Sequence, residues 1–377
     1  MPTMPYAELS TVKHCVQPGI ALPFNVRDAD GTLLLARGQL VESQVHLEAL
    51  FRRGALVDIT ELPSATDTVR TAPREQLPQL WAGCMNRLST VLSADPGPDF
   101  VGALDDAAVP VQALIQRDPD LAIFQVLRRG AGADTTYGAQ RSLQTAITSH
   151  LVAQRLGWDT DQCTLQFKVA LTMNISMLEL QGKLSRQATP PTPAQRHELQ
   201  THPMRSVRML ELAGITDTDW LQAVLQHHEQ EDGHGYPSGR TDVADLASLA
   251  RRADVYTSKL AARSTRDALA ADLAGRQMFM QDPTHPITTA LVREFGIYPP
   301  GCYVRLVSGE LAIVVARGDN ITMPVVTCLT TASGLPLAEP VRCAIDGKAR
   351  AVAGVVSEHQ TGLTLPMERL AGLVTNG

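Results

Sequence analysis

Residues 227–237 constrain this chain more than any other stretch, because they join two metal-ligating side chains to a tightly turning backbone. The sequence there is His-His-Glu-Gln-Glu-Asp-Gly-His-Gly-Tyr-Pro. Paired imidazoles are a common way to hold a transition metal in a protein. The glycines that follow permit sharp backbone turns that other residues resist. The stretch therefore predicts a metal site with a tight turn folded beside it.

Composition limits the classes of function. The chain has 377 residues, of which 44% are hydrophobic and 19% charged, as in an ordinary globular protein with two or three domains. Its formal charge of −6 argues against binding to DNA, RNA or a membrane surface, since each of these requires a basic face. A small anionic ligand needs only one local cationic pocket. The sequence has no run of about 18 apolar residues, so we expect no membrane span.

The cysteines indicate a reducing compartment. Six are present and none forms a CxxC pair, so neither a disulfide framework nor a zinc-finger spacing is predicted. They are Cys15, Cys84, Cys163, Cys302, Cys328 and Cys343. The N-terminal residues lack the basic and apolar regions of a signal peptide. We therefore expect reduced thiols and a cytoplasmic location.

The first 66 residues are predicted to form a small β-rich module of a sensory or regulatory kind. Residues 22–36 predict two strands joined by an Asp-Ala-Asp-Gly turn. A helix is expected at 43–53 and a further strand at 55–59. Residues 64–68 are rich in Ser, Thr and Asp and predict a linker.

Residues 67–298 show helical periodicity, which predicts a mainly α fold. Thr192 is a candidate cap with Pro193 in the first helical turn. The expected helices are 76–92, 142–156, 161–180, one opening at 193, 220–228, 244–262 and 265–281. Residues 299–377 return to a period of two and predict a small β appendage, with strands near 303–307, 312–316 and 324–328.

The string at 227–237 resembles the HHExxDGxGYP signature of the HD-GYP family, metal-dependent phosphodiesterases that cleave cyclic di-GMP. The resemblance covers roughly residues 137–262. It implies the helical bundle of the HD superfamily, and a site in which His and Asp side chains from several helices hold two or three metal ions, usually iron or manganese.

Four of the implied metal ligands are present. His202 stands before a proline, as in the family, and His227 and His228 form the adjacent pair. Asp254 lies in an Arg-Ala-Asp-Val-Tyr run and occupies the last ligand position. The resemblance also identifies Gly233, Gly235, Tyr236 and Pro237 with a loop thought to contact GGDEF-domain proteins, although Tyr236 and Pro237 also suit a purely structural turn.

Four other family positions are replaced, at Arg141, Met173, Asn174 and Met177. The family has His, the His-Asp pair and Lys there. Two close cations need a carboxylate to offset their repulsion, and Asn174 is neutral. Met173 offers a thioether that suits copper(I) better than iron or manganese. Arg141 places a permanent positive charge where a cation would lie.

These replacements predict at most one divalent ion (Fe, Mn or Zn), held by the three imidazoles, with no ion as the alternative. We expect Arg141 to pair with Asp254 in place of the second ion. If the register is displaced by a turn, Arg141 is instead an exposed residue at a helix start. For an anionic ligand, the nearest cationic candidates are Arg141, Arg205 and Arg252.

Three functions remain open at this stage. The preferred one is a degenerate HD-GYP protein in cyclic di-GMP signalling, which binds the nucleotide or a partner without hydrolysis and has no assigned catalytic residue. Its partners would be cyclic di-GMP or a related cyclic dinucleotide, and a GGDEF-domain or other signalling protein. The alternatives are a residual metal-dependent phosphodiesterase and an HD-superfamily interaction module unrelated to nucleotides.

Overall fold

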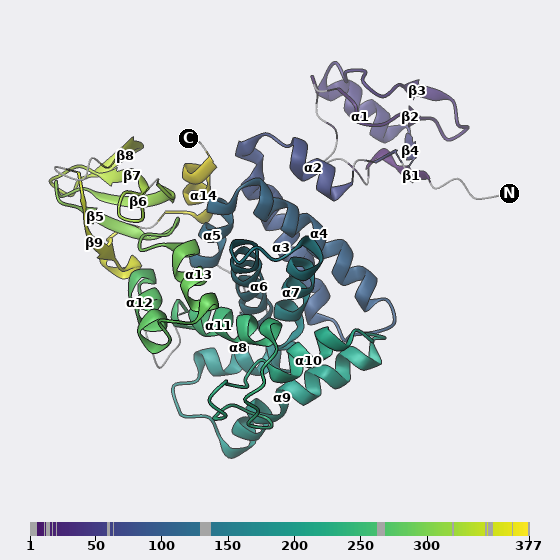
Figure 1. Cartoon of the computed structure of the whole chain (residues 1–377). Helices are drawn as coiled ribbons and strands as arrows, with labels where there is room; N and C mark the ends of the chain where they lie inside the picture. The colour runs from purple at the N-terminus through teal and green to yellow at the C-terminus, as the bar shows by residue number, and fades with distance from the viewer. Residues whose placement is uncertain are drawn as a thin grey trace. The chain divides into compact units, whose positions relative to one another are not determined.

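A computed structural model describes residues 6–10, 12, 16, 18–19, 21–58, 61–62, 64–128, 137–261, 268–318, 320–343, 345, 350–363 and 365–375. The chain forms two compact units, Met1–Thr71 and Ala72–Gly377 (Figure 1). The sequence placed a first boundary at 66/67 and treated residues 299–377 as an appendage. In the structure those C-terminal residues belong to the same unit as the helices.

The first unit is a four-stranded antiparallel sheet with one helix on it. The strands β1 (Tyr6–Glu8), β2 (Val26–Arg27), β3 (Leu33–Leu35) and β4 (Leu56–Asp58) lie in the order β1-β4-β2-β3, and α1 spans Gln44–Arg52. Phe24, Val26 and Val57 form the core together with Leu47 and Leu50 of α1. The predicted hairpin, helix and following strand are confirmed.

The predicted linker at 64–68 is wrong, because most of it is helical. α2 spans Ala65–Thr71. The hydroxyl of Ser64 accepts a hydrogen bond from the backbone N–H of Asp67 at 3.0 Å, so Ser64 caps the helix. The acidic side chain of Asp67 also lies in the first turn, where it favours the helix dipole. A polar, turn-rich composition here marks a helix start.

The second unit is built around one buried helix, α6. Its helices are η3 (Arg74–Gln76), α3 (Leu77–Ser93), α4 (Phe100–Arg117), α5 (Pro119–Leu127), α6 (Tyr137–Arg155), α7 (Thr160–Thr172), η5 (Ile175–Met177), α8 (Leu178–Arg186), α9 (Pro193–Leu212), α10 (Thr218–Gln226), α11 (Asp245–Lys259), α12 (Ala271–Gln281), α13 (Pro286–Phe295), η6 (Glu358–Gln360) and α14 (Met367–Thr375). α6 packs against α3, α5, α7, α8, α11 and α13 (Figure 1). The expected mainly α fold class is confirmed.

The helix expected at 161–180 is interrupted at Met173 and Asn174. α7 ends at Thr172, and Asn174 leaves the helical conformation with φ −105° and ψ 10°. Ser176 explains the break, because its backbone N–H donates to the Ser206 hydroxyl at 3.3 Å and its own hydroxyl donates to the His202 carbonyl at 3.0 Å. These bonds tie the chain to α9 instead of extending α7. The apolar run continues through the break, so periodicity could not show it.

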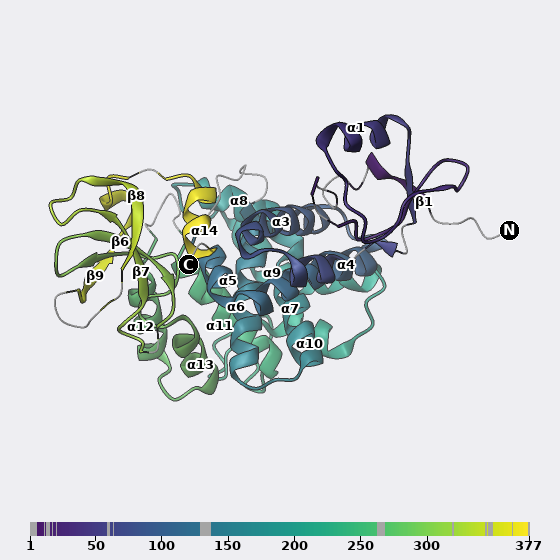
Figure 2. The same ribbon diagram turned by 90° about the horizontal axis from the view of Figure 1, so that it is seen from above.

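The C-terminal strands form one antiparallel sheet. β5 (Tyr303–Leu306), β6 (Leu311–Ala316), β7 (Val325–Thr330), β8 (Pro336–Cys343) and β9 (Val352–Val356) have the order β8-β7-β6-β5-β9. The three predicted strands are confirmed, while β8 and β9 were not foreseen. α14 packs against β6 and also against α3 and α5, so it lies between the sheet and the helices (Figure 2). In the described part of the chain, none of the helices has the length and apolar character needed to cross a membrane.

Candidate metal centre

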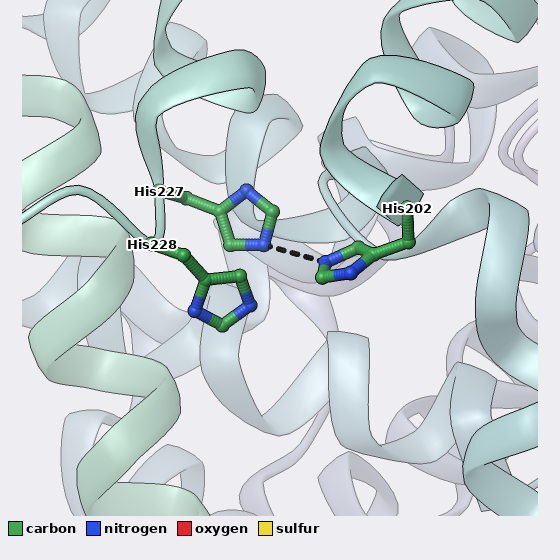
Figure 3. Close-up of side chains that lie close together, drawn as sticks. All are labelled: His202, His227 and His228. Carbon is green, nitrogen blue, oxygen red and sulfur yellow. Dashed lines mark hydrogen bonds between the residues drawn. The ribbon is translucent and has the colours of Figure 1, made fainter. Parts of the chain in front are cut away.

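Two histidines from different helices face each other at the centre of the candidate site. His202 lies in α9 and His227 directly follows α10, and both are fully buried. Their Nε2 atoms are 3.0 Å apart (Figure 3). The two residues come together because α9 and α10 pack against each other, which brings His227, at the end of α10, close to His202.

The hydrogen bonds of both rings fix where their protons lie. Nδ1 of His202 is 2.7 Å from the Leu199 carbonyl, and Nδ1 of His227 is 2.6 Å from the Val224 carbonyl. A carbonyl only accepts, so each Nδ1 carries the proton and donates it. Burial lowers the pKa of His202 and of His227 to about 3, so both rings are neutral at pH 7. Each Nε2 therefore directs a lone pair toward the other.

Two lone pairs 3.0 Å apart repel each other unless a cation lies between or beside them. Two imidazole nitrogens bound to one ion at about 2.0–2.1 Å lie about 2.9–3.4 Å apart, depending on the angle at the metal. The observed separation is within this range. The two Nε2 atoms thus fit a metal ion. A metal-bound histidine also needs an acceptor for the proton on its other ring nitrogen, and the two backbone carbonyls provide these acceptors.

His228 completes a group of three. The ligand atoms of His202, His227 and His228 all lie within 4.8 Å of one another. Burial also lowers the pKa of His228 to about 3. Its ring stacks on Tyr236, with centroids 4.5 Å apart and an interplanar angle of 18°. The three histidines selected from the sequence therefore converge (Figure 3).

Asp254 is placed differently. The group of three does not include it, and its carboxylate accepts a hydrogen bond from the Arg141 guanidinium at 3.0 Å. Arg141 also donates to the Asp254 backbone carbonyl at 3.2 Å. The expected ion pair is confirmed. Arg141 is buried in α6, so the alternative of an exposed helix-start residue is wrong.

The other replaced positions are also buried. Met173, Asn174 and Met177 lie at the break after α7, beside the segment that Ser176 ties to α9. Asn174 Oδ1 has no hydrogen-bond partner within the described residues. A single neutral carbonyl oxygen is a weaker donor to a hard cation than a carboxylate.

A loop held by Glu229 leads from the histidines to α11. The buried Glu229 carboxylate accepts the backbone N–H of Ser238 at 2.7 Å and that of Arg240 at 3.0 Å. Gly233 has a φ of 77°, which favours glycine. A Cβ on Gly235 would lie 2.4 Å from the Glu229 backbone. Gly233, Gly235, Tyr236 and Pro237 therefore form a defined turn beside His228.

Glu231 and Arg252 join this loop to the following helices. Glu231 accepts hydrogen bonds from Ser248 at 2.7 Å and from Arg252 at 2.9 Å. Burial raises the pKa of Glu231, but these hydrogen bonds outweigh it and lower the pKa to about 2. Glu229 and Glu231 were not selected from the sequence. Their closeness in sequence to the histidine pair was the signal that could have identified them.

The chain is similar to a family profile, a characterised protein and a solved structure. The profile of the HD domain family matches residues 131–271. The cyclic di-GMP phosphodiesterase PA4108 of Pseudomonas aeruginosa is 24% identical over 307 residues, which cover 78% of this chain and 73% of the relative. Among solved structures, Bd1817, an HDG"Y"P protein from Bdellovibrio bacteriovorus, has a TM-score of 0.49 and 16% identity, with coverage of 76% of this chain and 97% of that one.

Proposed function

We propose that the chain is a member of the HD-GYP family that holds one divalent metal ion on His202, His227 and His228 and binds a cyclic dinucleotide without hydrolysing it. The observation that carries this proposal is the pair of unprotonated Nε2 atoms 3.0 Å apart, together with a guanidinium that already pairs with Asp254.

The three imidazoles support one ion. Two of them direct lone pairs at each other, and their Nδ1 protons are held by backbone carbonyls, which keeps the rings oriented for coordination. When bound, the ion supplies a positive charge that attracts and polarises a phosphate oxygen. Iron, manganese and zinc all accept imidazole nitrogen, so the ligand set alone leaves the choice among them open.

The Arg141–Asp254 pair supports the loss of hydrolysis. Asp254 would serve a second metal, but its carboxylate is committed to a buried guanidinium that stays protonated at any physiological pH. Asn174 provides no negative charge to bring a second ion close. Hydrolysis of a phosphodiester by two metals needs both ions as a clamp on the attacking and leaving oxygens.

The proposed ligand and partners follow from the relatives. The curated relative is named for its action on cyclic di-GMP, and a ligand of that class carries the phosphates that a cation would hold. The loop of Gly233 to Pro237 is the proposed contact for a GGDEF-domain or other signalling protein. All five described cysteines are free, in keeping with the proposed cytoplasmic location.

Metal analysis of the purified full chain tests the first half of the proposal. After anaerobic exposure to Mn²⁺ or Fe²⁺ and desalting, we expect one equivalent per chain, and much less than one in His202→Ala and in His227→Ala. His197 is an exposed histidine of α9, the helix that carries His202, so His197→Ala is the matched control and should keep the metal. Two or more equivalents in the wild type would refute the single-ion reading.

Turnover of cyclic di-GMP tests the second half. We expect binding without turnover in the wild type, and a gain of turnover in the combined variant Arg141→His, Met173→His, Asn174→Asp, which restores the three family ligands. Wild-type turnover that disappears in His227→Ala would instead establish the residual phosphodiesterase. Absence of both nucleotide binding and metal would leave the interaction module as the function.

A further inference from the structure

Two successive arginines of α11 are used in different ways. Arg252 is buried, and each nitrogen of its guanidinium donates a hydrogen bond: to Glu231 at 2.9 Å, to Asp282 at 2.7 Å and to the Thr288 hydroxyl at 3.3 Å. It also contacts Ser248. Arg252 therefore ties the loop after His228 to α12 and α13, and each of its three guanidinium nitrogens already donates within the protein.

Arg251 is not engaged in this way. Its one close charged contact among the described residues is between Nη2 and Glu231 Oε2, at 3.5 Å. Its Nε is buried and has no hydrogen-bond partner within the described chain. A buried N–H without an acceptor costs free energy, so the position favours a ligand that supplies one. Glu231 does not meet this need, because its Oε1 accepts from Ser248 and Arg252, and its Oε2 lies 3.5 Å from Nη2 of Arg251 and not against Nε.

Arg251 contacts the loop that follows the histidine pair. It precedes Asp254 by three residues, so the two side chains leave α11 on neighbouring faces. Its contact, Glu231, follows His228 by three residues.

We infer that Arg251 is the anion-binding residue of the candidate metal centre, and that its unused N–H groups receive a phosphate oxygen of a ligand placed against the histidine cluster. The planar guanidinium presents several donors in a fork that matches a phosphate group. This inference rests on the proposed function for the identity of the ligand, a phosphodiester. It also replaces the cations chosen from the sequence: Arg141 and Arg252 are paired internally, and Arg205 pairs with Glu198 at 3.3 Å.

Calorimetric titration of the full chain with inorganic phosphate and, separately, with cyclic di-GMP tests the inference. We expect Arg251→Gln to weaken both ligands by about ten- to a hundredfold, the loss that follows removal of a charge-assisted hydrogen bond. Arg251→Lys keeps the charge and should recover part of the affinity. Arg208, an exposed arginine of α9 paired with Glu211, gives the control Arg208→Gln, which should bind as the wild type does.

Metal content and thermal unfolding of each variant separate this inference from the proposed function. If Arg251→Gln holds one metal equivalent, melts like the wild type and still binds both ligands with wild-type affinity, the inference is wrong and the metal proposal stands. If the wild type holds no metal but binds phosphate through Arg251, the metal proposal fails and the inference stands. Binding of phosphate but not of cyclic di-GMP, with the same dependence on Arg251, would identify free phosphate as the ligand. A wild type that binds neither ligand overturns the inference.

Discussion

At the scale of single residues, burial decides the charge state of a histidine outside the candidate site. His150 is buried in α6, its Nδ1 is 3.2 Å from the Cys163 carbonyl, and its ring meets Phe167 edge-on. Its Nε2 has no hydrogen-bond partner within the described residues. Desolvation lowers its pKa to about 4, so the folded protein holds this imidazole neutral.

This predicts a loss of stability in mild acid. The unfolded chain takes up a proton on His150 near pH 6.5 and the folded chain does so only near 4. The contribution of neutral His150 to the free energy of unfolding is therefore complete above pH 6.5. It falls by about 1.4 kcal/mol per pH unit as the pH drops from 6.5 toward 4. Chemical denaturation from pH 7 to 5 should show a shallower decline in His150→Gln than in the wild type. Parallel declines would contradict a neutral buried imidazole.

The same scale shows what could be predicted about the site. His202, His227 and His228 were found because their spacing matches a known signature. The Arg141–Asp254 pair was expected because the resemblance places both residues at metal-ligand positions and their charges are opposite. The choice between Arg251 and Arg252 could not be predicted. The two are adjacent on one helix, and only the positions of Glu231, Asp282 and Thr288 in space determine which of them is bound within the protein.

At the scale of elements, the loop between α10 and α11 depends on close backbone packing. A Cβ on Gly235 would lie 2.4 Å from the Glu229 backbone and from the Gln230 nitrogen. Either the turn or Glu229 must move to admit a side chain. Since Tyr236 stacks on His228, such a movement reaches the histidine cluster directly.

We therefore expect Gly235→Ala to weaken metal binding at least tenfold and to lower the free energy of unfolding by about 1–3 kcal/mol. Gly275 offers the matched control: it lies inside α12, and an added Cβ there would meet no atom within 4 Å. Gly275→Ala should keep the metal and stabilise the chain by up to about 1 kcal/mol, because alanine favours a helix. Metal titration and chemical denaturation of both variants test this prediction. Equal metal affinities and equal free energies of unfolding in the two variants would contradict the packing argument.

Element boundaries were predicted where a local signal exists. Thr192 accepts the Gln195 N–H at 3.2 Å, and Pro193 opens α9 as expected. α4, α5 and α13 were missed, although α5 and α13 both start with a proline behind a capping side chain. The break after α7 depends on Ser206, thirty residues further along the chain, so no local pattern could reveal it.

At the scale of the whole molecule, the C-terminal sheet is joined to the helices by arginines. Arg317, just after β6, donates to Asp120 of α5 at 2.5 Å and to Glu294 of α13 at 2.5 Å. The carboxylate of Glu294 also accepts a hydrogen bond from Arg155 of α6. Arg128, after α5, donates to the Gly301 carbonyl, lies over the Tyr303 ring and pairs with Glu358 at 3.0 Å. Period-two patterning predicted these strands, but long-range ion pairs leave no periodic signal.

Removing Arg317 should destabilise the second unit as a whole. Arg317→Gln removes the cation paired with Asp120 and one of the two cations paired with the buried carboxylate of Glu294. We expect a loss of about 2–3 kcal/mol, somewhat below the value for a fully buried pair because Arg317 is partly exposed. The exposed Arg87–Asp106 pair, at 3.9 Å, provides the control: Arg87→Gln should cost less than about 0.5 kcal/mol. Equal losses in denaturant titration would contradict a structural role for Arg317.

The guanidinium of Arg141 has a consequence for the whole fold. A ferrous ion can be chelated, oxidised or withheld when the cell is starved of iron, whereas an arginine is synthesised with the chain and stays charged. The junction of α6 with α11 at Asp254 thus depends on a charge that is part of the chain and not on the supply of an ion.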